Sequence, residues 1–185
     1  MIKWDKYTSV NIVEGRLANF LQTYNKPNSL LVASSGCQDR FLPYIFNSNK
    51  INWVGKIYSN VDNMLDIKDL YEKQDYLRRS NYDHIIGFGG GSAIDKAKML
   101  TLINSTHRIT YKNESYRISR IDSSNEPNPV LAVIPTTLGT GSEVTSFATC
   151  WDLIKKKKYS FQTAYTLPKY VLLDPSLLLS LPRKI

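Results

Sequence analysis

The sequence predicts an α/β fold with a doubly wound parallel sheet, which is covered by helices on both faces. Short apolar runs typical of buried strands alternate with stretches of helical pattern along the chain. Two of these runs end in glycine-rich turns, and the alternation is that of βαβ units with right-handed crossovers. Because 42% of the 185 residues are hydrophobic, the chain can bury one sizeable core. We therefore expect one domain over residues 1–185.

The first half of the chain contains two predicted βα units. An apolar strand is expected at residues 29–33. A helix follows at residues 39–46, with Pro43 in its first turn, where proline is tolerated. The next strand is expected at residues 54–58. A polar amphipathic helix at residues 66–79 completes this half.

The second half continues the same alternation. Strands are expected at residues 84–88 and 130–134, and a helix at residues 93–103 lies between them. The intervening stretch at residues 112–128 is polar, so we expect an irregular excursion there. This order of elements indicates a parallel sheet.

The turn Gly87-Phe88-Gly89-Gly90-Gly91-Ser92 joins the strand at residues 84–88 to the following helix. A strand, a glycine turn and a helix in that order leave backbone N–H groups free to receive anionic oxygens. Glycine lets the backbone approach a pyrophosphate closely, and Ser92 is expected to cap the helix start and to donate its hydroxyl. The turn departs from the G-x-G-x-x-G pattern because it ends in Ser, so by itself it is equally compatible with a plain tight turn.

Three sequence blocks resemble the iron-containing alcohol dehydrogenase family and follow one another in that family's order. They are Gly89-Gly90-Gly91-Ser92-Ala93-Ile94-Asp95-Lys96-Ala97-Lys98, Pro135-Thr136-Thr137-Leu138-Gly139-Thr140-Gly141-Ser142-Glu143-Val144-Thr145, and Leu173-Asp174-Pro175-Ser176-Leu177 with Leu181-Pro182. The resemblance extends over essentially the whole chain and is strongest over residues 83–182. It implies a Rossmann-like dinucleotide-binding domain of an NAD(P)-dependent oxidoreductase that interconverts alcohols and aldehydes.

Members of this family also have an all-helical domain that binds a divalent metal, iron or zinc, through one Asp and three His. The resemblance implies that these ligands begin just after the third block. We therefore expect the C-terminal helical metal-binding domain to be absent from this chain, and residues 174–185 to begin the link to it. His84 and His107 lack ligand spacing and are expected to be ordinary histidines, so we assign no metal ligand and no catalytic residue in this chain.

The resemblance implies ten cofactor-binding residues. The glycine turn would hold the pyrophosphate, and short hydroxyl side chains would line the dinucleotide groove, although capping of a strand end is the alternative for any one threonine. Asp95 and Lys98 would lie near the cofactor and the cleft, and Asp95 is also placed to form a capping pair with Ser92. We expect Asp174 to cap or turn the chain. The ten residues are Gly89, Gly90, Gly91, Ser92, Asp95, Lys98, Thr136, Thr137, Ser142 and Thr145.

The end of the strand at residues 29–33 bears on the choice between NAD and NADP. Relatives that prefer NAD often place an Asp there, which binds the ribose 2′-hydroxyl, whereas this chain has Ser34-Ser35-Gly36-Cys37. Without that negative charge a 2′-phosphate is not repelled, and Arg40 or Lys56 is available to assist its binding. The cofactor is therefore expected to be NADP or NAD, and the sequence leaves both open.

Composition excludes several classes of partner. The net charge of +8 is mostly dispersed, and its one dense run at residues 155–158 is predicted to be the tip of a β-hairpin, so we expect no nucleic-acid partner. Cys37 and Cys150 are too few for a disulfide framework and are expected to be free thiols. The sequence has neither an apolar run of about 18 residues nor a secretory leader, so we expect no membrane span and a cytoplasmic location.

The leading hypothesis is the cofactor-binding half of a metal-dependent alcohol dehydrogenase or aldehyde reductase, inactive alone. Residues 147–152 and 157–160 resemble a branch that includes phosphonoacetaldehyde reductases, which implies a small alcohol or aldehyde substrate. Apolar residues within 174–185 favour self-association, so a homo-oligomer is expected. The alternative is a non-catalytic nucleotide-binding or regulatory module. Dehydroquinate synthase-like and glycerol dehydrogenase-like activities share the general fold, but the second block fits them less well.

Overall fold

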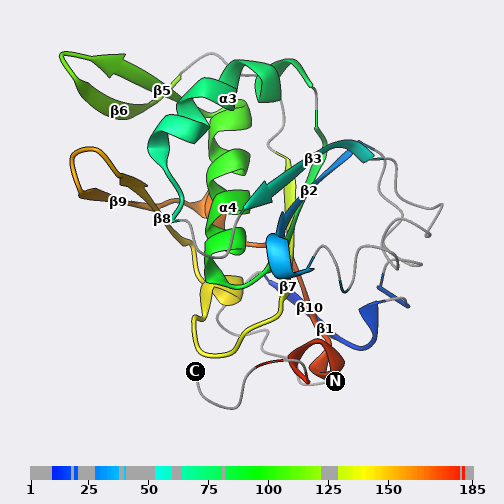
Figure 1. The fold of residues 1–185 in the computed structure, drawn as a ribbon. Coiled ribbons are helices and arrows are strands. Elements are labelled where there is room, and N and C mark those ends of the chain that lie inside the picture. Colours follow the sequence, from blue (N-terminus) through cyan, green and yellow to red (C-terminus); the bar gives the residue numbers. More distant parts are fainter. Residues whose placement is uncertain are drawn as a thin grey trace.

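A six-stranded parallel sheet forms the centre of the protein (Figure 1). The computed structural model describes residues 10–17, 19–20, 28–37, 40, 64–80, 82–121, 129–179 and 181, and the backbone of residues 53–59. In spatial order the strands are β1 (Asn11–Glu14), β10 (Tyr170–Leu173), β7 (Val130–Pro135), β4 (His84–Gly89), β2 (Ser29–Ser34) and β3 (Trp53–Ser59). The predicted strands are confirmed, each within one residue at either end.

The interiors of the central strands β2, β4 and β7 carry no polar side chain, because both faces of the sheet are covered. In β2, Leu30 and Val32 join a core cluster on the face that α3 and α4 cover, whereas Leu31 and Ala33 join the cluster on the opposite face. Successive strand residues point to opposite faces, so a strand that is buried on both faces needs an unbroken apolar run. The doubly wound arrangement predicted from the sequence is thereby confirmed.

Two helices lie side by side over the first face of the sheet (Figure 1). α3 (Ile67–Arg79) begins after Asp66, whose carboxylate accepts a hydrogen bond from the Lys68 N–H at 3.0 Å. α4 (Gly91–Ser105) is longer than the helix predicted at residues 93–103 and runs from the end of β4. Almost every side of α4 packs against the sheet, α3 or the β8–β9 hairpin, which is why even the charged Lys96 and Lys98 on this helix are buried. The predicted helix at residues 39–46 falls outside the described residues except for Arg40.

Two antiparallel hairpins project from the α/β core (Figure 1). β8 (Phe147–Asp152) pairs with β9 (Lys157–Gln162), which confirms the hairpin predicted around the lysine-rich tip. β5 (His107–Lys112) pairs with β6 (Ser115–Arg120), so the irregular excursion predicted at residues 112–128 is wrong at its start. Asn113 and Glu114 both have positive φ, which is the backbone of a tight two-residue turn. Residues 122–128 lie outside the described part of the chain.

The described residues also include three short 3₁₀ segments, namely η1 (Ser142–Val144), η2 (Ala164–Thr166) and η3 (Pro175–Leu178), and helical residues at positions 17, 19–20, 35–37 and 40. Within the part of the chain that the structure describes, no helix combines the length and the apolar character needed to cross a membrane.

The contact between α4 and β4 depends on Gly87. A Cβ at this position would lie 2.9 Å from Ala97 Cβ, which is closer than side chains pack. We expect Gly87→Ala to push α4 away from the sheet and to lower the free energy of unfolding by about 1–3 kcal/mol, as overpacking does. Urea denaturation measures this change. Gly15→Ala is the matched control, because among the described residues no atom beyond its chain neighbours lies within 4 Å of the Cβ it would add. Equal stability of the two variants would contradict this prediction.

Candidate functional site

The predicted site lies at the carboxyl edge of the sheet, where β2, β4 and β7 end. β3 lies on one side of β2 and β4 on the other, so the direction of winding reverses between β2 and β4. In open α/β sheets, ligands bind in the crevice at such a reversal. The ends of the strands are level with one another. Phe88 of β4 is in register with Ala33 of β2, and Gly89 is in register with Pro135 of β7.

The glycine turn leads from β4 directly into α4. Gly89 has a φ of +147°, and a Cβ there would lie 2.8 Å from Ser34 Oγ. Gly90 is the N-cap residue of α4 and has no side-chain hydrogen bond that caps the helix. The prediction that Ser92 caps the helix is therefore wrong, because α4 begins at Gly91 and Ser92 is its second residue.

The first turn of α4 suits an anion. The N–H groups at the start of a helix have no intrahelical acceptor and form the positive end of the helix dipole. Here neither a capping side chain nor an acidic residue of the first turn neutralises that end, and the Ser92 side chain is exposed beside it. A phosphate oxygen is the ligand that such an arrangement fits.

Residues 136–145, which we call the threonine loop, lie against the glycine turn. The Thr136 N–H donates a hydrogen bond to the Gly89 carbonyl at 3.0 Å. A Cβ at Gly90 would lie 3.2 Å from Thr137 Oγ1. The absence of side chains in the glycine turn therefore makes room for the threonine loop as well as for a ligand.

The tip of the threonine loop follows the first turn of α4. A Cβ at Gly91 would lie 3.1 Å from Thr140 Cγ2. Gly139 and Gly141 have φ values of 91° and 64°, in the left-handed region that glycine adopts without strain. Leu138 is 74% exposed, so little apolar burial holds the tip in place.

Asp95 joins α4 to the far end of this segment. One carboxylate oxygen accepts a hydrogen bond from Ser142 Oγ at 2.7 Å. The other oxygen accepts from the Thr149 N–H at 3.1 Å and from Thr149 Oγ1 at 2.9 Å. The predicted capping pair between Asp95 and Ser92 is therefore not formed, because Asp95 turns toward η1 and β8.

Lys98 makes a second connection between α4 and this segment. Its side chain is fully buried, and Nζ donates to the carbonyl oxygens of Thr145 and Phe147, both at 2.7 Å. Burial lowers the pKa of Lys98 to about 8, although the carboxylates of Asp95 and Glu143 act to raise it. The amine lies among protein atoms rather than at the surface.

The glycine turn, α4 and the threonine loop bring all ten predicted residues into one region. Thr140 and Thr149 also lie in this region, although the sequence analysis did not select them. Thr140 lies against Gly91, and Thr149 donates to Asp95. Thr140 stands between two glycines in a hydroxyl-rich loop, which is a signal that the sequence offered. Thr149 offered none, because it lies in a strand and its partner Asp95 is 54 residues away.

The end of β2 closes the other side of the region. Ser34 Oγ donates a hydrogen bond to Cys37 Sγ at 3.1 Å, and Cys37 Sγ lies 3.7 Å from Thr136 Oγ1. Cys37 and Cys150 are both buried free thiols, as predicted. Burial raises the pKa of Cys150 to about 12, and the nearby Asp66 and Asp95 act in the same direction, so its thiol is unreactive.

Residues 34–37 at the end of β2 carry no carboxylate. Arg40 lies beside this segment, because a Cβ at Gly36 would be 3.5 Å from one guanidinium nitrogen of Arg40. The Arg40 side chain is exposed and therefore available to a ligand. The side chain of Lys56, the other predicted cation, lies outside the described residues.

Glu143 in η1 has a buried carboxylate oxygen near Lys98. Glu143 Oε2 is buried, and no hydrogen-bond partner for it lies among the described residues. A buried carboxylate oxygen without a donor destabilises a structure.

Asp174 has the capping role predicted for it. Its carboxylate accepts hydrogen bonds from the Ser176 N–H at 2.9 Å, which begins η3, and from the Leu17 N–H at 2.7 Å. Burial alone would raise the pKa of Asp174, but these hydrogen bonds and the nearby Arg16 hold it below its ordinary value.

The residues that the structure describes do not fit a metal site. Among them, no three His, Cys, Asp or Glu side chains are grouped so as to hold a metal ion. We therefore assign no metal-binding role to the described residues.

The chain matches known proteins over most of its length. The family described as iron-containing alcohol dehydrogenase matches residues 10–175. An aldehyde-alcohol dehydrogenase of Streptococcus pneumoniae is 27% identical over 98% of the chain and 22% of that protein. A sulfoacetaldehyde reductase of Bilophila wadsworthia is 28% identical over 97% of the chain and 47% of that protein. The chain thus spans less than half the length of either relative.

A solved structure has the same fold. The sulfoacetaldehyde reductase from Bifidobacterium kashiwanohense, in complex with NAD⁺, aligns with a TM-score of 0.69 at 19% identity. The alignment covers 98% of this chain and 49% of that chain. It confirms the predicted fold class, a doubly wound α/β domain.

The burial of Lys98 predicts a pH dependence of stability. Between pH 8 and its ordinary pKa of 10.5, Lys98 has lost its proton in the folded chain but keeps it in the unfolded chain. Unfolding then takes up a proton, so the free energy of unfolding rises with pH across this window. We expect the wild type to gain stability relative to Lys98→Met from pH 8 to pH 10.5, as measured by urea denaturation at several pH values. If the difference in the free energy of unfolding between wild type and Lys98→Met stayed constant from pH 8 to pH 10.5, the proposed titration of a buried Lys98 amine would be wrong.

Proposed function

This chain belongs to the iron-containing alcohol dehydrogenase family, and we propose that its glycine turn binds the pyrophosphate of NADP or NAD. The longer enzyme of which this chain would form a part would transfer a hydride between the nicotinamide and a small alcohol or aldehyde. The observation that carries the proposal is the uncapped first turn of α4, which lies at the reversal of winding and beside glycines that leave its N–H groups open.

Each part of the site has a role in this proposal. The N–H groups of Gly91 and Ser92 receive pyrophosphate oxygens, and the exposed Ser92 hydroxyl adds a donor. The hydroxyls of Thr136 and Thr137 line the groove beside the turn. When bound, the nicotinamide supplies the hydride chemistry, and this chain holds the cofactor in place.

Residues 1–185 are proposed to form the dinucleotide-binding unit of a longer enzyme. The chain corresponds to 47% of the Bilophila wadsworthia reductase and to 49% of the solved reductase, so about half of either protein has no counterpart here. Residues 174–185 would begin the link to a helical domain that supplies the metal. In support, Leu179 is 85% exposed directly after η3, although Leu177 is buried in the core. We also propose that the exposed surface at Leu179 contacts another copy of the chain in a homo-oligomer.

The substrate is proposed to be a small aldehyde or its alcohol, and an anionic two-carbon aldehyde is the specific candidate. The similarity of the β8–β9 hairpin to phosphonoacetaldehyde reductases supports this choice. The relationship to a sulfoacetaldehyde reductase supports it independently, because a sulfonate and a phosphonate are both anionic tetrahedral groups. Steady-state assays of an enzyme that includes this chain, with sulfoacetaldehyde, phosphonoacetaldehyde and uncharged acetaldehyde, would separate these candidates. Cofactor binding without turnover of any of them would favour the non-catalytic module instead.

The uncapped helix start predicts a variant that separates folding from binding. We expect Ser92→Asp to keep the stability of the fold or to raise it by up to about 1 kcal/mol, because an acidic residue favours the first turn of a helix. The same charge repels a pyrophosphate, so we expect the affinity for both cofactors to fall at least about tenfold, or about 1.4 kcal/mol.

Calorimetric titration with NADP(H) and NAD(H) measures this effect. Ser119→Asp is the matched control, because it makes the same change of charge at an exposed position of β6, away from the turn. An unchanged affinity of Ser92→Asp, or an equal loss in both variants, would rule out the helix start as the pyrophosphate site.

Between the two cofactors, we propose a preference for NADP. The end of β2 has no carboxylate to repel a 2′-phosphate, and Arg40 beside Gly36 is an exposed guanidinium at that point. A guanidinium matches the geometry of a phosphate with paired N–H donors.

We expect Arg40→Ala to weaken NADP binding about tenfold, as the loss of one charge-assisted contact does, and to leave NAD binding unchanged. NAD is therefore the internal control in the same titrations. If Arg40→Ala weakened both cofactors equally, or if the wild type preferred NAD, the proposed preference would be wrong.

A further inference from the structure

Asp95 and Lys98 project from the same side of α4, because residues three apart on a helix are neighbours. Both side chains contact the segment that runs from the threonine loop into β8. Asp95 accepts hydrogen bonds from Ser142 and Thr149, and Lys98 donates to the carbonyl groups of Thr145 and Phe147. Five hydrogen bonds at 2.7–3.1 Å thus attach this segment to α4.

The geometry suits a permanent connection. The fully buried Lys98 amine has two carbonyl acceptors at 2.7 Å, and a neutral amine keeps two N–H donors. The carboxylates of Asp95 and Glu143 are the charged groups that act on it. Both hydrogen bonds are therefore retained whether Lys98 is protonated or neutral.

The threonine loop needs these polar anchors, because apolar packing does not hold its tip. Leu138 at that tip is largely exposed, and Gly139 and Gly141 contribute no side chain. The start of the loop is held by Thr136, which pairs with Gly89. Its far end is held by Asp95 and Lys98, one to two turns along the helix whose first turn bears the glycines.

We propose that Asp95 and Lys98 are positioning residues, which act through the threonine loop and do not contact the dinucleotide. They hold the loop against α4, so that the loop and the helix start stay together as one preformed cradle. This inference rests on the proposed cofactor binding and assigns the two residues a different role from direct contact. A loop that occupies its binding conformation for only part of the time lowers the apparent affinity in the same proportion.

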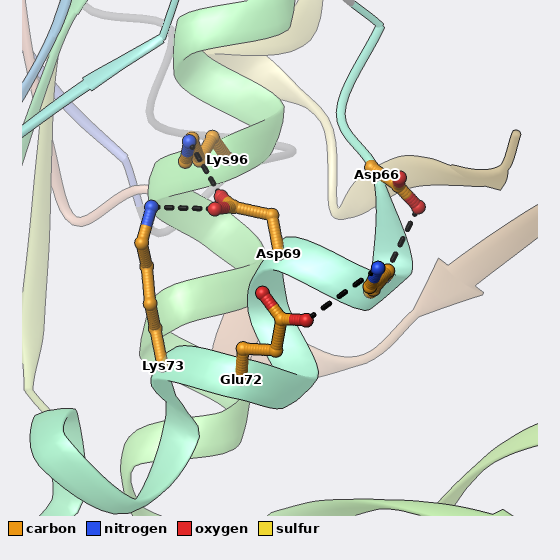
Figure 2. A network of polar contacts seen from close by, with 6 residues as sticks. Asp66, Asp69, Glu72, Lys73 and Lys96 are labelled. Carbon is orange, nitrogen blue, oxygen red and sulfur yellow. Dashed lines mark hydrogen bonds and ion pairs between the residues drawn. The ribbon is translucent and has the colours of Figure 1, made fainter.

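Lys96 on the same helix provides a matched control. Its side chain is 8% exposed, and Nζ lies 3.1 Å from a carboxylate oxygen of Asp69. Figure 2 shows that Lys96 and Lys73 both reach Asp69, so Lys96 connects α4 to α3 and not to the threonine loop. Lys96→Met therefore removes a buried ammonium of α4 without touching the cradle.

The test compares Asp95→Asn, Lys98→Met and Lys96→Met with the wild-type chain. Cofactor dissociation constants are measured at a temperature at which every variant is folded, and hydrogen exchange is measured at the amides of residues 138–147 without cofactor. We expect Asp95→Asn and Lys98→Met to raise the dissociation constant and the exchange rate about tenfold each, as for a loop that is competent about one-tenth of the time. Lys96→Met is expected to change both by less than about twofold, whatever its effect on stability.

If Asp95→Asn or Lys98→Met fails to fold, Thr149→Val provides a further test. It removes only the hydroxyl that donates to Asp95, and we expect a smaller rise in exchange that is not additive with Asp95→Asn. If hydrogen exchange at residues 138–147 were no faster in Asp95→Asn and Lys98→Met than in Lys96→Met, the positioning role would be overturned. Faster exchange with unchanged affinity would overturn the link to binding. A wild-type chain that bound neither cofactor would refute the proposed function, and the exchange data would still decide whether Asp95 and Lys98 hold the loop.

Discussion

The close approach of α4 to β4 is the constraint on which the rest of the site depends. It is possible only because Gly87 has no side chain where Ala97 crosses the strand. At that separation the first turn of α4 emerges over the carboxyl edge of the sheet, between the ends of β2 and β7. Lys96 then joins the helix to α3, whereas Asp95 and Lys98 join it to the threonine loop. A single packing contact thus sets where the N–H groups of the helix point.

The strands could be predicted closely because both faces of the sheet are buried. The interiors of β2 and β4, residues 30–33 and 85–88, contain no polar side chain, and such a run has few alternatives when turn residues bound it. The β5–β6 hairpin could not be predicted in this way. Most of its residues are polar, only Ile109 and Tyr116 of its two strands are buried, and its turn, Asn113-Glu114, lacks the glycine that marks most two-residue turns. Pairing between β5 and β6, rather than local pattern, determines this element.

That the ten predicted site residues lie close together could also be predicted, but the hydrogen-bond partners of their side chains could not. The sequence places Asp95 and Lys98 beside the glycine turn, and a capping pair with Ser92 is the partner that local spacing offers to Asp95. In the structure both residues face a segment about 50 residues further along the chain, which only the tertiary fold brings to α4. The glycines likewise have a second use that no local rule indicates, because Gly90 makes room for Thr137.

The exposed tip of the threonine loop has a consequence for how long the chain survives in a cell. Leu138 projects between small residues in a segment that is attached mainly at its two ends, and proteases cleave exposed segments that open locally. A ligand that binds only the closed loop lowers the population of the open form in proportion to its free concentration. Degradation of the protein would then slow as the supply of the dinucleotide that we propose it binds increases.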